Sequence, residues 1–310
     1  MNPVASLTEQ AAYFERAAAV RVRDDLCILR VGGEDARTWL NGQTTHDVRS
    51  IASGVGAYGL VVSVKGKVLA DIWVFDRAND MAVALPRSVR EVLRERFESQ
   101  IFMEYVEIGE DATVLISVQG PLAREVVTAA RVGAQHAYAC DELGRGGVFV
   151  ACTPEAAPTV LAALVRVAEA CGGGAVDEAG FELARLRAGR PRFGADFSER
   201  NYPQEAGLKD LAVSFSKGCY LGQEVVCTLE HRGRLNRHLV RLETTDAPAA
   251  GDVLTDAHGE AIGALTSVVR DPALDRTLAL GYVKRALASV GTEVRAGSAT
   301  LAIRGLVGSA

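Results

Sequence analysis

Residues 217–224 read Lys-Gly-Cys-Tyr-Leu-Gly-Gln-Glu and form the most unusual stretch of the chain. They place a cation, a thiol, two glycines, an amide and a carboxylate within eight residues. The lysine two residues before Cys219 and a possible helix start beside it would favour the thiolate, which is the form that acts as a nucleophile or ligand. Free cysteines are also common as small buried apolar residues. The residues alone leave both interpretations of Cys219 open.

A basic run follows, because residues 231–238 read His-Arg-Gly-Arg-Leu-Asn-Arg-His. Such a run is usually a solvated loop, although it could contact an anionic ligand or RNA. The chain carries 34 Lys and Arg against 39 Asp and Glu, a net charge of −5, so direct nucleic-acid binding is not expected. Cys219, Cys227 and His231 could converge on a metal, but their spacing fits no common zinc module. We therefore predict no metal site.

The character of the sequence changes near Arg237, where we place a domain boundary between residues 1–237 and 238–310. After it, short apolar runs separated by Pro, Gly and Asp turns are typical of a small barrel or sandwich. The strands predicted there are 239–243, 261–269, 277–283 and 299–303.

Before the boundary, apolar runs predict strands that come in pairs rather than alternating regularly with helices. These strands are 26–31, 58–64, 67–75, 81–85, 103–108, 113–118 and 147–152. Helices are predicted at 87–100, 122–130 and 160–170. The first of them has a capping-box pattern at Ser88 and Glu91, and its expected buried face contains Val89, Val92, Leu93 and Phe97. The fold class is therefore α+β with antiparallel sheets.

Residues 54–59 match the dinucleotide pattern G-x-G-x-x-G. That fingerprint needs a preceding strand and a following helix, whereas a strand is predicted after this one. We interpret it as a glycine-rich turn that enters a hairpin.

Composition narrows the class of protein further. Apolar residues make up 48% and charged residues 24%, as in an ordinary folded protein. The longest stretch without formal charge, residues 50–64, is shorter than the roughly 20 residues of a spanning helix, so no membrane association is expected. The N-terminus has no visible signal or transit peptide, and the six cysteines lack a paired framework. These features predict a cytoplasmic protein with reduced thiols.

The stretch 217–224 resembles the signature K-G-C-[YF]-x-G-Q-E of the YgfZ family of folate-binding proteins, which includes mitochondrial iron–sulfur assembly factors. Other strings are similar to the related glycine-cleavage T-protein. They are Gly33-Glu34-Asp35-Ala36 with Leu40, Thr45 and Asp47-Val48, then Arg185-Leu186-Arg187-Ala188-Gly189, and Pro203-Gln204-Glu205-Ala206-Gly207-Leu208. The resemblance covers most of the chain.

The resemblance implies a cloverleaf of two interlocked α+β subdomains and a C-terminal antiparallel β-barrel, with tetrahydrofolate as cofactor in a central hole. Arg185 matches a T-protein arginine that helps to hold folate, and its guanidinium could pair with the carboxylates of the folate tail. Asp71 falls where the T-protein has its catalytic aspartate, although an edge-strand carboxylate is an equal alternative. Glu205, Gln223 and Glu224 lie in the matching strings and are predicted to bind the cofactor.

One departure concerns the T-protein pterin-binding signature, which is represented only by residues 142–150 without its final glutamate. Folate-dependent aminomethyl transfer is therefore the alternative function rather than the leading one. The leading hypothesis is a tetrahydrofolate-binding protein that supports assembly or repair of iron–sulfur clusters in client enzymes, including tRNA-modifying ones. Whether the protein is itself an enzyme is left open.

The candidate catalytic residues are Cys219, Lys217 and Asp71. Cys219 is expected to be the most reactive thiol, with Cys227 a less certain competitor. The other four cysteines lie within or beside apolar runs and are expected to be shielded. These are Cys27, Cys140, Cys152 and Cys171.

Overall fold

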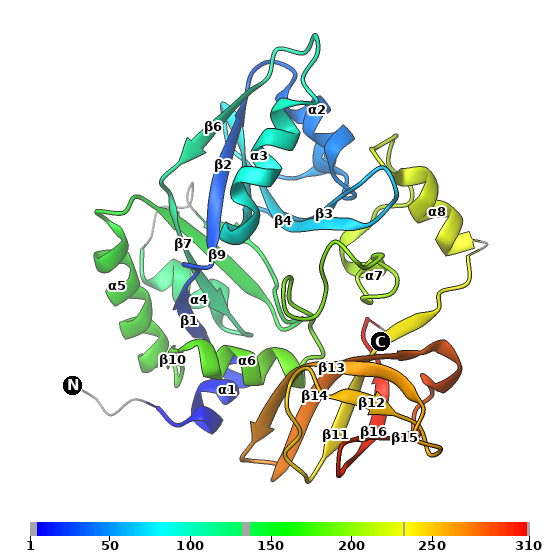
Figure 1. Cartoon of the computed structure of the whole chain (residues 1–310). Coiled ribbons are helices and arrows are strands. Elements are labelled where there is room, and N and C mark those ends of the chain that lie inside the picture. Colours follow the sequence, from blue (N-terminus) through cyan, green and yellow to red (C-terminus); the bar gives the residue numbers. More distant parts are fainter. Residues whose placement is uncertain (1–4, 132–136, 232, 309–310) are drawn as a thin grey trace.

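The computed structural model describes residues 5–131, 137–231 and 233–308, so Arg232 of the basic run lies outside the described residues. Two sheets and a barrel surround a central region (Figure 1). The N-terminal sheet has the strand order β3, β4, β5, β2, β6. Its strands are β2 (Leu26–Gly32), β3 (Gly56–Val62), β4 (Val68–Asp76), β5 (Asp80–Pro86) and β6 (Glu107–Asp111).

The middle sheet has the strand order β10, β1, β7, β9, β8. Its strands are β1 (Ala19–Val22), β7 (Val114–Gln119), β8 (Ala137–Ala139), β9 (Gly147–Cys152) and β10 (Gly174–Ala175). The chain leaves this sheet after β1, builds the whole N-terminal sheet, and returns at β7, which pairs antiparallel with β1. The two α+β subdomains are therefore interlocked.

The two sheets pack against each other, because successive side chains of a strand point to opposite faces. On β2, Leu26 and Ile28 belong to the core shared with Phe149 of the middle sheet. Cys27 and Leu29 face the other way and pack with the helices α2 (Ala36–Gln43) and α3 (Arg90–Glu98). Helices α4 (Ala123–Ala129) and α5 (Ala157–Ala170) cover the far face of the middle sheet.

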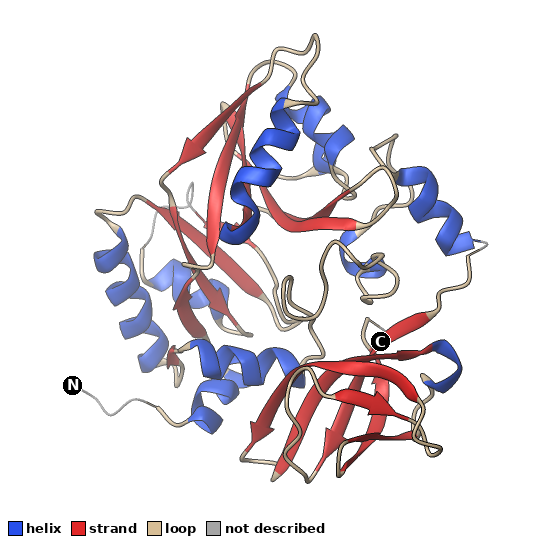
Figure 2. Cartoon of the chain, viewed as in Figure 1, coloured by secondary structure: helices blue, strands red, loops and turns tan. Residues whose placement is uncertain are grey.

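The C-terminal part is a closed antiparallel barrel with the strand order β11, β14, β13, β12, β15, β16. Figure 2 shows it as a group of strands set apart from the helix-covered sheets. Its strands are β11 (Arg237–Thr244), β12 (Val253–Thr255), β13 (Ala261–Asp271), β14 (Arg276–Lys284), β15 (Glu293–Ala296) and β16 (Ala299–Leu306). Buried aliphatic side chains such as Val240, Leu265 and Ile303 fill its interior.

Helix α6 (Glu178–Arg187) connects the parts, because it contacts helix α1 (Leu7–Arg16) on one side and barrel strands β13 and β14 on the other. The side chain of Asp177 caps its first turn by accepting a hydrogen bond from the Gly180 N–H at 2.9 Å. Two shorter helices follow, α7 (Lys209–Ala212) and α8 (Gln223–His231). Within the described ranges, no helix combines the length and apolar character that crossing a bilayer requires.

The predicted α+β class and C-terminal barrel are confirmed, and most predicted strands match the observed ones to within three residues. The glycine pattern at 54–59 is indeed a turn into the β3–β4 hairpin. The capping box at Ser88 and Glu91 is wrong, because residues 87–89 form a 3-10 turn and Glu91 instead accepts a hydrogen bond from Arg90. Val92 is also 66% exposed, since the buried face follows the spacing of Leu93 and Phe97.

The strand predicted at 103–108 begins only at Glu107. Residues 101–106 form a projecting loop instead, at the top of the molecule in Figure 1. Three large apolar side chains of this loop, Phe102, Met103 and Tyr105, are exposed to solvent, with Met103 at 92%, whereas Val106 and Ile108 pack against the core. Burial in the sheet therefore does not explain the apolar character of the three exposed residues.

Candidate functional site

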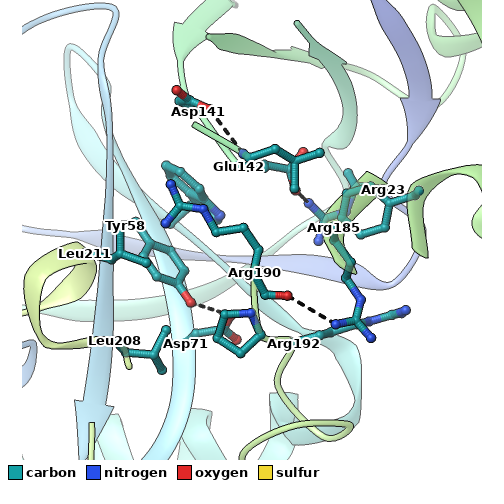
Figure 3. Close-up of a pocket in the computed structure, with 14 residues that line it drawn as sticks. Arg23, Tyr58, Asp71, Asp141, Glu142, Arg185, Arg190, Arg192, Leu208 and Leu211 are labelled. Atoms are coloured by element: carbon teal, nitrogen blue, oxygen red, sulfur yellow. Dashed lines mark hydrogen bonds and ion pairs between the residues drawn. The ribbon is translucent and has the colours of Figure 1, made fainter. Parts of the chain in front are cut away.

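A pocket of about 140 Å³ lies between strands β3 and β4, loops of the middle sheet, helix α6 and the segment that follows it (Figure 3). A cavity of about that size accommodates one small aromatic ring, so a larger ligand would extend through the opening. Charged, aromatic and a few aliphatic side chains line it. The lining residues are Arg23, Tyr58, Asp71, Trp73, Asp141, Glu142, Leu143, Phe181, Arg185, Arg190, Pro191, Arg192, Leu208 and Leu211.

The carboxyl of Asp71 is the most perturbed acid of the pocket. Asp71 and Trp73 are two residues apart on β4 and therefore point to the same face, where Tyr58 of β3 lies beside Trp73. The Tyr58 hydroxyl donates a hydrogen bond to Asp71 Oδ2 at 3.0 Å. Burial raises the pKa of Asp71 to about 6, although the Tyr58 hydrogen bond and Arg23 oppose the shift. A carboxyl in this state can accept hydrogen bonds or exchange a proton near neutral pH.

A second acid of the pocket, Glu142, is already paired. It forms an ion pair with Arg23 and accepts a hydrogen bond from the Ser117 hydroxyl. Its own N–H donates to the Gln119 side chain at 2.9 Å. Glu142 is thus held in place from the middle sheet by an ion pair, whereas the described residues form no ion pair with Asp71.

Arg185 forms part of the pocket wall and is only 2% exposed. Its guanidinium donates five hydrogen bonds: two to Glu182, one to Asp196, one to the Arg190 carbonyl and one to the Ser267 hydroxyl. A guanidinium has five N–H groups. The protein itself therefore satisfies every donor of Arg185 in this conformation.

Arg190 differs from Arg185 because its guanidinium is available to a ligand. Its side chain is half-buried and reaches across the pocket between Glu142 and Tyr58 (Figure 3). Among the described residues its guanidinium has no hydrogen bond or ion pair, whereas its backbone is fixed to Arg185 at both N–H and C=O. The pocket thus contains a positioned cation that is free to pair with an anionic ligand. Arg190 was not predicted from the sequence, although the Arg-Pro-Arg run after Gly189 was a signal for it.

Lys217 lies elsewhere, in the segment that precedes α8. The residue is 7% exposed, and its ammonium donates to three backbone carbonyls, those of Asn41 at 2.5 Å, Thr44 at 2.7 Å and His46 at 2.8 Å. Burial lowers the pKa of Lys217 to about 8. All three donors of the ammonium are used at the C-terminal end of α2, so Lys217 anchors this segment to the N-terminal subdomain.

Cys219 is exposed next to this anchor, so its thiol is accessible to other molecules. Helix α8 begins at Gln223 rather than at Cys219, and Glu224 on its first turn is exposed. Glu205 is buried beneath β11, where it pairs with Lys67 at 3.8 Å and accepts a hydrogen bond from the Tyr202 N–H.

The structure therefore divides the predicted site residues into two groups. Asp71 and Arg185 meet in the pocket, whereas Glu205, Lys217, Cys219, Gln223 and Glu224 are not among its lining residues. Within the described part of the chain, no three His, Cys, Asp or Glu side chains are arranged to hold a metal ion. The prediction that Cys171 is shielded is wrong, because it follows the last turn of α5 and is exposed.

Two family descriptions match the chain: the GCVT N-terminal domain over residues 10–139 and the glycine cleavage T-protein C-terminal barrel domain over residues 237–303. The tRNA-modifying protein YgfZ of Vibrio vulnificus is 29% identical across 75% of this chain and 72% of that protein. The chain is a YgfZ-type member of the T-protein family.

Two relatives connect this YgfZ-type protein to the T-protein itself. An aminomethyltransferase of Corynebacterium jeikeium is 26% identical across 89% of this chain and 81% of that protein. The crystal structure of the glycine cleavage system aminomethyltransferase T from Bartonella henselae superposes with a TM-score of 0.85 at 21% identity, covering 98% of this chain and 90% of that one. The T-protein-like arrangement of two interlocked subdomains and a barrel is therefore confirmed.

Proposed function

We propose that this protein binds a reduced folate, with tetrahydrofolate as its cofactor, in the pocket around Asp71 and Arg190. The observation that carries the proposal is that one pocket with aromatic walls contains both the unpaired guanidinium of Arg190 and the Asp71 carboxyl, whose pKa is raised to about 6. A pterin ring offers N–H donors to a carboxylate and a flat face to Tyr58, Trp73 or Phe181, and the tail of folate ends in carboxylates that suit a guanidinium. Bound tetrahydrofolate would supply a carrier for one-carbon units.

The two arginines have different parts in this proposal. Arg190 binds the folate tail, whereas Arg185 holds the backbone of Arg190 in position through the contacts at its N–H and C=O. Arg185 is thus a positioning residue, because a ligand carboxylate could reach it only by displacing Glu182, Asp196 or Ser267.

Calorimetry with 5-formyltetrahydrofolate, a stable reduced folate, tests the proposal. Arg190→Ala should weaken binding by about ten- to a hundredfold, as expected for loss of one charge-assisted contact. Arg124→Ala on the exposed side of α4 serves as the matched control and should bind as the native protein does. No binding by the native protein, or equal binding by the Arg190 variant, would refute the assignment.

We further propose that the protein supports assembly or repair of iron–sulfur clusters in client enzymes, including tRNA-modifying ones. The support is the YgfZ-type sequence 217–224 and the position of Cys219, which is exposed on a segment that Lys217 anchors. The test is complementation of a strain that lacks this gene, with iron–sulfur enzyme activities measured under oxidative stress. Cys219→Ala should fail to restore these activities while it still binds folate. Cys171→Ala, at another exposed thiol, should restore them fully.

Aminomethyl transfer of the T-protein type stays a second candidate, because Asp71 has a pKa of about 6 inside the pocket and could move a proton there. Incubation of the protein with tetrahydrofolate and an aminomethyl-lipoyl carrier distinguishes the two functions. Turnover that Asp71→Asn abolishes would establish the transferase. Its absence, together with folate binding, would support the non-transferase role.

A further inference from the structure

The loop of residues 101–106 exposes an unusual amount of apolar surface for a solvated loop. Phe102 is 79% exposed, Met103 92% and Tyr105 75%, so three large side chains within four positions are unpacked. Single exposed apolar residues are common on protein surfaces, but adjacent ones form a patch of the kind that marks an interaction site. Phenylalanine, tyrosine and methionine are also enriched at protein interfaces.

The loop is held in a defined shape rather than left free. The Glu104 carboxylate accepts hydrogen bonds from the N–H groups of Phe102 and Met103, both at 3.0 Å. Asp35 fixes the other end, because its carboxylate accepts the Tyr105 N–H at 2.8 Å and its own N–H donates to the Tyr105 carbonyl at 3.3 Å. A surface that is ordered before binding loses less conformational entropy when a partner docks.

One glycine makes this attachment possible. Gly33 has a φ of +104°, and a Cβ at that position would lie 1.9 Å from the Tyr105 carbonyl oxygen. The backbone of the loop can therefore approach the end of β2 only because residue 33 has no side chain.

The charges around the patch indicate what it contacts. Glu34, Glu104 and Glu107 are exposed beside the three apolar side chains, and Arg30 is the neighbouring cation, 3.5 Å from Glu107. This acidic rim would repel an anionic membrane surface. It would also repel itself if two copies met through the same patch, because like charges would then face each other.

We propose that the loop of residues 101–106, together with Glu107 at the start of β6, forms a docking surface for a protein partner that offers an apolar pocket rimmed by lysine or arginine. This surface is separate from the folate pocket and from Cys219, so the inference goes beyond the proposed function. Phe102 and Met103 would fill the partner's apolar pocket, and Glu104 and Glu107 would face its basic rim.

The test uses the full chain in its native cells, with the photo-cross-linking residue benzoylphenylalanine in place of Met103. The same residue in place of Val290, which is 72% exposed on the barrel, is the control. We expect the Met103 probe, and not the control, to give one discrete protein adduct. Mass spectrometry should place the linked atom beside apolar and basic residues of that protein.

Titration with the purified partner follows. Phe102→Ser should weaken its binding about thirtyfold or more, as for an interface hot spot, and Glu107→Lys should weaken it and reduce its dependence on salt. Val92→Ser, at another exposed apolar residue of the same subdomain, should change neither binding nor stability. Folate affinity should be unchanged in all three variants, which shows that they are folded and separates this proposal from the previous one.

Several results would overturn the proposal. They are equal adducts from both probe positions, an adduct to a second copy of the chain, an adduct on an acidic surface, or native affinity of the Phe102 variant. Flotation of the protein with phosphatidylcholine vesicles, with or without phosphatidylserine, would also overturn it, because the patch would then be a membrane contact.

Discussion

The thiols show how far a single residue's surroundings decide its chemistry. Cys27 and Cys140 are buried, and burial raises the pKa of both thiols. Cys219 and Cys171 are exposed, although the first lies in a chemically rich string and the second follows an apolar helix. The exposure of Cys219 agrees with the accessible thiol expected from the sequence, and its reactivity stays a prediction. The exposure of Cys171 was not predicted, because apolar neighbours in the sequence do not show which side of a helix end faces the solvent.

Limited alkylation near neutral pH should therefore label Cys219 and Cys171 first and leave Cys27 and Cys140 unmodified, because reactivity follows thiolate character and exposure. Cys152 and Cys227 are partly buried and should react at intermediate rates. Peptide mass spectrometry over time gives the order. Early labelling of Cys140 would contradict the buried environment described for it.

Asp71 should make folate binding pH-dependent. Its carboxyl has a pKa of about 6, so it is mostly ionised at pH 7 and mostly protonated at pH 5. If the ionised form accepts the pterin N–H groups, the Kd for 5-formyltetrahydrofolate should rise roughly tenfold between these two pH values. Asp71→Asn should bind more weakly at pH 7 and lose most of this dependence. Binding by the native protein that stays constant from pH 7 to pH 5 would exclude a role for the Asp71 carboxylate.

The raised pKa of Asp71 affects the stability of the unliganded protein in the opposite direction: stability falls as the pH rises. The folded pKa of Asp71 lies above its usual value, so the folded state holds this proton more tightly than the unfolded state. The contribution of Asp71 to stability is therefore present at low pH and is lost as the pH rises through about 6.

At the level of elements, local sequence patterns were sufficient to predict the long strands but not to predict which residues meet in the pocket. Strands such as β9 were predicted because a Val-rich run bounded by turn residues indicates a strand from local sequence alone. Strands β12 and β15 were missed because they have three and four residues, too few for a pattern. Arg190 and Tyr58 come from segments far apart in the chain, and only the tertiary fold brings them together at the pocket.

The segment before α8 illustrates the same limit, because Lys217 looked like a catalytic group and its surroundings make it an anchor. Lys217→Met keeps the apolar stem but leaves the carbonyls of Asn41, Thr44 and His46 without their donor. We expect a loss of about 2–3 kcal/mol in the free energy of unfolding and faster hydrogen exchange in residues 214–222. Urea unfolding and exchange mass spectrometry measure both. Lys65→Met, at an exposed lysine, is the control, and equal behaviour of the two variants would show that the anchor is dispensable.

At the scale of the whole molecule, the barrel is joined to the rest of the protein through buried charges on α6. Asp196 accepts hydrogen bonds from Arg185 at 2.7 Å, from the Ser267 hydroxyl at 2.7 Å and from the Thr266 hydroxyl at 2.5 Å. Arg187 forms a second connection, a bidentate pair with the fully buried Asp271. Two contacts between α6 and β13 thus fix the orientation of the barrel.

Removing one partner of such a buried pair is costly, because the other charge stays buried without compensation. Asp196→Ala should therefore lower the free energy of unfolding by about 3 kcal/mol or more, since Arg185 loses one of its two carboxylates. Asp210→Ala, whose side chain is 65% exposed beside Lys209, should change it by less than about 1 kcal/mol. Denaturant titration of both variants provides the comparison. Similar stability of the two would show that the α6–β13 contact does not hold the barrel.

The path of the chain through the middle sheet has a consequence for synthesis. Strand β1 emerges from the ribosome early, yet one neighbour, β7, follows only after the whole N-terminal sheet, and the other, β10, comes about 150 residues later. At roughly 5–20 residues per second, β1 waits about 8–30 seconds for that second neighbour. Helix α1 waits longer still, because its partner α6 follows β10. The first segment to be made is thus among the last to be buried, and a nascent chain stalled before residue 174 would present β1 as an open edge.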